Sequence, residues 1–323
     1  MKRTLFTVVG TSLLLGACGG NLFEEPDQAT TTGSITPANA LTTTRASWQA
    51  ALASGNLATI GSSVGLSAGG PGSFSKANGG LSEASLTQLL QKVPFGPDEI
   101  PCLASGTATI SGDIADPTDP TRLSINDTFR VVYAACNDGI GEVLDGTIDM
   151  TVRDFVGDLQ AGTYMLSMGA VTTDFQVAVG GETILNNGDT TLALDTMQTP
   201  LIDVGTSGAT LRVDSNSRSD TLTGYQSNQT LDGNLAPAPY TFIASGTLDS
   251  TSLNGTIRYS TIDTFQGVAG EFPSQGRFRV QGSGSSLELV TIDNVNVDIE
   301  IDTNGDGVID VTISTTWADV SSG

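Results

Sequence analysis

The sequence predicts an all-β protein: a mainly antiparallel sandwich or curved sheet or barrel of about a dozen strands, preceded by a short helical N-terminal segment. Three observations predict this class. Apolar and polar residues alternate with period two through residues 96–323, turn dipeptides separate the alternating runs, and no strand–helix–strand alternation occurs. The pattern therefore assigns a β domain to residues 96–323, but it does not distinguish a sandwich from a curved sheet or barrel.

The strands are predicted where the alternation is clearest. Four runs place these residues on one face: Ile148, Met150 and Val152; Phe175, Val177 and Val179; Val295, Val297, Ile299 and Ile301; Ile309, Val311, Ile313, Thr315 and Trp317. Turns are predicted at five dipeptides that favour tight hairpins: Asp138-Gly139, Asp145-Gly146, Asn187-Gly188, Asp232-Gly233 and Asn254-Gly255. Strands joined by such short turns pair antiparallel.

Residues 37–95 are predicted to form a small helical and Gly/Ser-rich segment. Thr36 is the expected N-cap of a first helix, and Gly55 is its expected stop. Four residues of this helix fall near one face: Leu41, Trp48, Ala51 and Leu52. A second helix is predicted over residues 82–93.

Residues 1–17 are typical of a secretory signal, with a basic start and an apolar run that is too short to span a bilayer, which needs about 20 residues. The run Leu13-Leu14-Leu15-Gly16-Ala17-Cys18 resembles the lipobox of bacterial lipoproteins. The resemblance implies cleavage before Cys18 and attachment of acyl chains such as palmitate to it. Gly19, which stands where an Asp favours inner-membrane retention, implies the outer membrane. The alternative is an ordinary signal peptide with a chance cysteine.

Residues 18–36 show no periodicity and are predicted to form a flexible tether, lipid-anchored through Cys18, that holds the rest of the chain at the membrane. The expected location is therefore the bacterial cell envelope.

The charge and composition exclude several classes of function. Cleavage would remove Lys2 and Arg3, and the net charge would change from −22 to −24. So acidic a chain repels phosphate, and no nucleic-acid partner is expected. The chain has no histidine. This excludes the Ser-His-Asp and Cys-His catalytic sets and histidine-ligated zinc, and we expect no enzyme.

The two cysteines outside the signal region, Cys102 and Cys136, form an even pair in an exported protein. A structural disulfide is the interpretation that the oxidising setting favours. A metal pair or a free redox thiol is the alternative, although neither cysteine stands in a C-x-x-C arrangement.

The most specific motif is the polar run over residues 302–310, whose oxygen spacing suits calcium. The expected ligands are the side chains of Asp302, Asn304, Asp306 and Asp310 and the carbonyl of Val308. Gly307 would allow the sharp turn, and Ile309 would anchor the loop to the core. The run resembles EF-hand and dockerin loops, but Ile313 stands where those loops carry a bidentate carboxylate. The alternative is a long polar hairpin turn. A bound ion would be structural.

A second resemblance covers residues 272–319, through the Pro273-Ser274-Gln275-Gly276 turn and the Asp/Asn loop. This stretch is similar to C-terminal regions of β-rich envelope lipoproteins of proteobacteria, and the region from Cys102 to Cys136 is similar to the same group. The resemblance implies class and location, and no activity.

Three functions are compatible with these observations. The first is a non-enzymatic envelope or surface module, structural or adhesive. The second is a carrier of a lipid or other apolar ligand inside a curved sheet or barrel. The third and weakest is a carboxylate-dependent polysaccharide hydrolase, which needs two facing acids in a cleft. An envelope protein, a glycan or a lipid could be the partner.

Overall fold

A computed structural model describes residues 30–62, 95–102, 104–113, 123–137, 142–158, 161–179, 182–214, 218–235, 237–253 and 255–321. The expected signal peptide, the expected lipid-bearing Cys18 and the expected helix over residues 82–93 lie outside the described residues.

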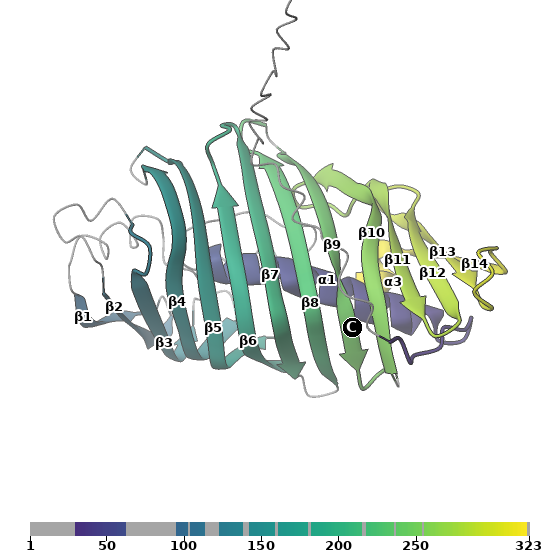
Figure 1. Ribbon diagram of the computed structural model, residues 1–323, viewed down its shortest axis with the longest axis horizontal. Coiled ribbons are helices and arrows are strands. Elements are labelled where there is room, and N and C mark those ends of the chain that lie inside the picture. The colour runs from purple at the N-terminus through teal and green to yellow at the C-terminus, as the bar shows by residue number, and fades with distance from the viewer. Residues whose placement is uncertain are drawn as a thin grey trace, which may run out of the picture.

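The chain forms one antiparallel sheet of fourteen strands, in which each strand pairs with the strands before and after it in the sequence (Figure 1). The strands are β1 (Phe95–Pro101), β2 (Ser105–Asp113), β3 (Thr128–Asn137), β4 (Glu142–Asp158), β5 (Thr163–Val179), β6 (Glu182–Asp195), β7 (Leu201–Asp214), β8 (Ser219–Asp232), β9 (Pro239–Ser250), β10 (Gly255–Val268), β11 (Gln275–Gly282), β12 (Ser285–Thr291), β13 (Asn296–Asp302) and β14 (Val311–Thr316). The described residues also form the helices α1 (Ala40–Ser62) and α3 (Trp317–Ser321). The predicted antiparallel β class is confirmed. The sheet is open, with β1 and β14 at its edges.

Two of the predicted turns are wrong, because their glycines lie inside strands. Asp145-Gly146 falls within β4 and Asn187-Gly188 within β6. The pairing register shifts at both places, which is the signature of a β-bulge. Gly146 has φ +104°, and a Cβ on Gly188 would lie 2.4 Å from the carbonyl oxygen of Thr210. Both positions therefore require glycine for a bulge, and β4 and β5 extend through the region to 17 residues each.

The first predicted helix exists, but both of its ends differ from the prediction. Residues 37–39 form a turn, and α1 begins at Ala40 with the N–H of Thr43 donating to the carbonyl of Asn39 (2.8 Å). The Asn39 side chain accepts from the N–H of Thr36 (2.8 Å), which closes the turn. The helix also continues past Gly55 to Ser62. An interior glycine costs a helix only about 1 kcal/mol relative to alanine, so the tertiary contacts of α1 can override it.

Helix α1 crosses the strands on one face of the sheet and contacts β6, β7, β8, β9 and β13 (Figure 1). Because these strands lie far apart in the sheet, the C-terminal half must curl around the helix. Trp48 occupies the centre of this core, with ring centroids 4.9 Å from Phe265 and 4.9 Å from Trp317. Ala51 and Leu52 are buried in the same cluster, as predicted from the helical face.

A second apolar cluster lies under β2 to β7 and shares no buried residue with the first. It includes Ile148, Met150 and Val152, which confirms the predicted inward face of that run. The sheet is therefore continuous while its buried side chains form two cores.

The chain preceding α1 is bound to the sheet. The N–H groups of Thr32 and Gly33 donate to the carbonyl of Thr256 on β10 (3.0 and 3.1 Å), and the N–H of Ile35 donates to Oγ of Ser285 (2.8 Å). Ile35 is buried in the first core. The last residues of the predicted tether thus belong to the folded body.

Neither described helix is long and apolar enough to cross a membrane.

Candidate functional site

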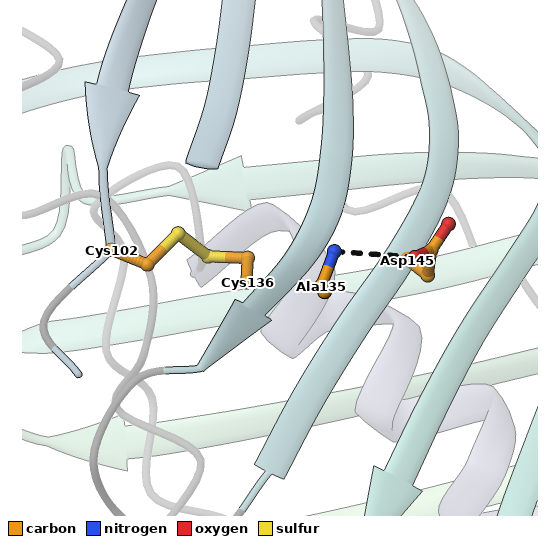
Figure 2. The surroundings of a disulfide bond; sticks show 4 residues. All are labelled: Cys102, Ala135, Cys136 and Asp145. Atoms are coloured by element: carbon orange, nitrogen blue, oxygen red, sulfur yellow. Dashed lines mark hydrogen bonds between the residues drawn. A yellow bond between two sulfur atoms is a disulfide. The ribbon is translucent and has the colours of Figure 1, made fainter. Parts of the chain in front are cut away.

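Cys102 and Cys136 are joined by a disulfide that spans 34 residues of sequence (Figure 2). Cys102 directly follows β1, and Cys136 lies in β3, so the bond passes across the end of β2. Ala135, beside Cys136, has φ +46°, and its N–H donates to Oδ2 of Asp145 on β4 (3.2 Å; Figure 2). The bond therefore fastens the edge strand β1 to the third strand.

The predicted calcium loop connects β13 to β14, and its first residue, Asp302, is almost fully buried (3% exposed). Its Oδ1 accepts the N–H groups of Asn304 (3.2 Å) and Gly305 (2.7 Å), and its Oδ2 accepts the N–H of Gly307 (2.8 Å). Burial acts to raise the pKa of Asp302, but these backbone donors outweigh it and lower the pKa below its usual value. The carboxylate is thus held ionised inside the loop.

The other predicted side-chain ligands also accept backbone N–H groups of the loop, but each accepts fewer of them than Asp302 does. Oδ1 of Asn304 accepts the N–H of Asp306 (2.9 Å), and Oδ1 of Asp306 accepts the N–H of Val308 (2.8 Å). Oδ2 of Asp310 instead accepts the N–H of Thr303 (2.9 Å). The expected anchoring of the loop by Ile309 is wrong, because that side chain is 42% exposed. The following strand already begins at Val311, so Ile309 does not reach the core.

The donor set suits a hard cation in part. Each carboxylate or amide oxygen has two lone pairs, so Oδ2 of Asp302, Oδ1 of Asn304 and both oxygens of Asp306 keep acceptor capacity. Within the described residues, however, no three acidic or cysteine side chains converge on one point. A cation would therefore depend on Asn304 and the Val308 carbonyl as much as on carboxylates, which favours weak binding.

Two arginines that the sequence analysis did not identify, Arg258 and Arg279, lie near this loop. A groove of about 680 Å³ is lined by Asp302, Arg258, Arg279 and Glu288, among others. Arg279 donates from Nε (3.0 Å) and Nη2 (2.6 Å) to Oε1 of Glu288. The two guanidinium groups oppose a cation in the groove itself. The period-two spacing of Arg277 and Arg279 could have indicated a shared face, but not its neighbours across the sheet.

Two aspartates with opposite pKa shifts, Asp214 and Asp220, lie where β7 and β8 pair at their hairpin end. A hydrogen bond from Oγ of Ser219 (2.5 Å) lowers the pKa of Asp214. Burial raises the pKa of Asp220, against the effects of Ser250 and of Arg218, whose Nε lies 2.9 Å from Oδ2. Opposed shifts are typical of acid–base pairs. Asp220 is only 4% exposed and ion-paired, so it is not positioned to protonate a bound glycan.

A second groove, of about 530 Å³, lies where β8 ends and β9 and β10 meet the following turn. Asp232 and Glu271 both line it. Oε2 of Glu271 accepts from Nδ2 of Asn294 (2.9 Å), and its carbonyl accepts the hydroxyl of Tyr240 (3.3 Å). Asp232 and Glu271 are one pair of groove carboxylates that the hydrolase alternative could use, and Asp302 and Glu288 in the first groove are another.

Comparison of the chain with known protein families, with curated proteins and with solved structures finds no match.

Proposed function

We propose that this chain is a non-enzymatic module of the bacterial cell envelope, structural or adhesive, held at the membrane by a lipid on Cys18. The observation that carries the proposal is the way helix α1 fills the inner face of the C-terminal half of the sheet. Trp48, Phe265 and Phe278 are each at most 1% exposed there. A carrier needs that space for its ligand, whereas a structural module needs it packed.

The chemistry of the described residues supports the same choice. The buried acid Asp220 is ion-paired with Arg218, and the groove carboxylate Glu271 is engaged by Asn294. General acid catalysis requires a carboxyl group that can reach the substrate and change its protonation state. The hydrolase is therefore the least supported of the three proposed functions.

Native mass spectrometry distinguishes the module from the carrier. The probe is the chain with Cys18→Ser, exported and purified without detergent, so that no anchoring lipid contributes mass. The module predicts a bare polypeptide. The carrier predicts an additional apolar molecule that survives purification, and that result would overturn our assignment. Addition of a fluorescent fatty acid gives a second readout, because only a carrier should bind it saturably.

We further propose that one structural calcium ion binds the loop over residues 302–310, through Asp302, Asn304, Asp306, Asp310 and the carbonyl of Val308. Calcium should raise the melting temperature of the chain in the range of about 10⁻⁴–10⁻³ M that is typical of weak extracellular sites. The matched pair of variants is Asp306→Asn, in the loop, and Asp263→Asn, on β10. A melt that neither calcium nor chelator moves would refute the ion, and so would an equal calcium response in both variants.

A further inference from the structure

The two edges of the open sheet differ in their protection against further strand pairing. Strand β1 carries Pro97 and Pro101, which lack N–H donors, and the charged residues Asp98 and Glu99. Strand β14 (VTISTT) has no proline and no charged residue. Prolines and charges are the usual devices that keep an edge strand from pairing with another chain. Only the β14 edge lacks them.

The backbone of β14 offers a regular row of hydrogen-bonding groups at this edge. The N–H of Trp317 donates to the carbonyl of Val295 (2.9 Å), which continues the β13–β14 register. Residues two apart in an antiparallel strand point to the same side, so Val311, Ile313 and Thr315 also face β13. The N–H and C=O groups of Thr312, Ser314 and Thr316 therefore point away from the sheet. Among the described strands, β14 pairs with β13 alone.

The inner face of the sheet is incompletely covered at the same edge. On β13, Val297, Ile299 and Ile301 are all 0% exposed. On β14, Val311 and Ile313 pack against the same core but are only half-buried. One more strand beside β14 would cover these two side chains and extend the core by one layer.

The outward side chains of β14 make this edge complementary to itself. In chain order they are Thr312, Ser314 and Thr316, a sequence that reads the same in both directions. We propose that β14 pairs antiparallel with β14 of a second copy of this chain, about a two-fold axis at Ser314. The axis places Ser314 opposite Ser314 and Thr312 opposite Thr316. The Ser314 hydroxyl donates to Oδ1 of Asp298 (2.7 Å) and the Thr316 hydroxyl to Oδ2 of Asp319 (2.8 Å), so the pairing rests on the main-chain hydrogen bonds between the two strands.

The charges at the ends of the strand set the strength of this dimer. Asp310 precedes β14 and Asp319 follows it, and the two-fold axis brings Asp310 of one copy toward α3 of the other. Six paired residues also bury less surface than a standard interface of about 1,600 Å². The dimer is therefore concentration-dependent, and added salt strengthens it by screening the like charges.

Cysteine cross-linking tests the axis directly. All variants are made in the full chain with Cys18→Ser. Directly opposed, hydrogen-bonded residues have Cα atoms about 5.5 Å apart, within the range that a disulfide can bridge. Ser314→Cys should therefore form a covalent dimer under mild diamide oxidation, at twice the chain mass of 33.1 kDa. Thr312→Cys is the matched control, since it is exposed on the same face but lies about 13 Å along the strand from its copy.

A proline variant tests the backbone pairing without cross-linking. Ser314→Pro removes an N–H that faces the open edge and leaves the β13–β14 ladder intact, whereas Ser314→Ala keeps the N–H and removes only the hydroxyl. Sedimentation equilibrium should show dimerisation of the parent chain and of Ser314→Ala, and a monomer for Ser314→Pro with an unchanged circular dichroism spectrum. A monomeric parent chain, equal cross-linking at positions 312 and 314, or a persistent Ser314→Pro dimer would each overturn the proposal.

Discussion

Trp48 is the residue through which α1 is fixed to the sheet. Its indole ring is edge-on to Phe242, Phe265 and Phe278, and it packs at a tilt against Trp317. Such aromatic pairs contribute beyond the area that they bury. A single side chain thus connects the N-terminal helix, the middle of the sheet and the C-terminal helix.

Removing this ring should destabilise the whole C-terminal half. Trp48→Ala leaves a large cavity among aromatic neighbours and should lower the unfolding free energy by about 3–5 kcal/mol. Urea titration followed by circular dichroism measures the change. Trp48→Phe is the control, because it keeps a ring in the cavity and should cost clearly less. Equal losses in the two variants would show that the indole is not packed as described.

Asp302 should make stability depend on pH in the acid range. Its pKa is lowered from 3.8 in the folded chain, so folding favours the ionised form. The contribution is complete above the unfolded value and is lost as the pH falls through the lower folded pKa. Between about pH 5 and pH 3, the unfolding free energy of the parent chain should therefore fall more steeply than that of Asp302→Asn. The difference in slope is the readout, because the variant also changes stability at every pH.

At the scale of the elements, the disulfide holds the N-terminal edge of the sheet. β1 pairs with β2 alone among the described strands, and the Cys102–Cys136 bond ties its end to β3. Closing a loop of 34 residues lowers the conformational entropy of the unfolded chain, which raises the free energy of unfolding by about 3–4 kcal/mol. The Cys102→Ser, Cys136→Ser double variant should therefore have a free energy of unfolding lower by about 3–4 kcal/mol. Reductant should lower the melting temperature of the parent chain and leave the double variant unchanged; an equal response in both would contradict the assignment.

The sequence alone predicts the class of the elements better than their limits. Alternation identifies Val297, Ile299 and Ile301 as inward residues of one strand, and all three are buried. Val295 continues the same alternation but is 56% exposed, because the strand begins only at Asn296. Asp145-Gly146 has the composition of a hairpin turn and forms a bulge instead. A bulge and a turn both need a glycine that can adopt positive φ, so local composition does not separate them.

At the scale of the whole molecule, the sequence does not predict features that depend on which strands lie side by side in the sheet. The spacing of oxygens over residues 302–310 predicts a calcium loop, and in the structure the backbone N–H groups of this loop converge on Asp302. The spacing does not reveal that Arg258 and Arg279 line the adjoining groove, because those residues come from β10 and β11. For the same reason, alternation along each strand does not show whether the last strand is covered, and the open edge at β14 emerges only from the pairing order.

The two separate cores predict two levels of local stability. In the first core, Phe265, Phe278 and Leu287 are 0% exposed, whereas Leu166, Leu192 and Leu194 of the second core are 4–7% exposed. Helix α1 packs mainly on β6 to β9 and on β13, so β1 to β5 lack its cover, and the N-terminal half should open first. Hydrogen exchange in rising urea should show backbone amides of β2 to β5 exchanging before those of β9 to β13. In the disulfide-free variant the difference in urea concentration at which the two halves exchange should increase, because the bond stabilises only the N-terminal half. Simultaneous exchange of both halves at every urea concentration would instead mean that the continuous sheet unfolds as one cooperative unit.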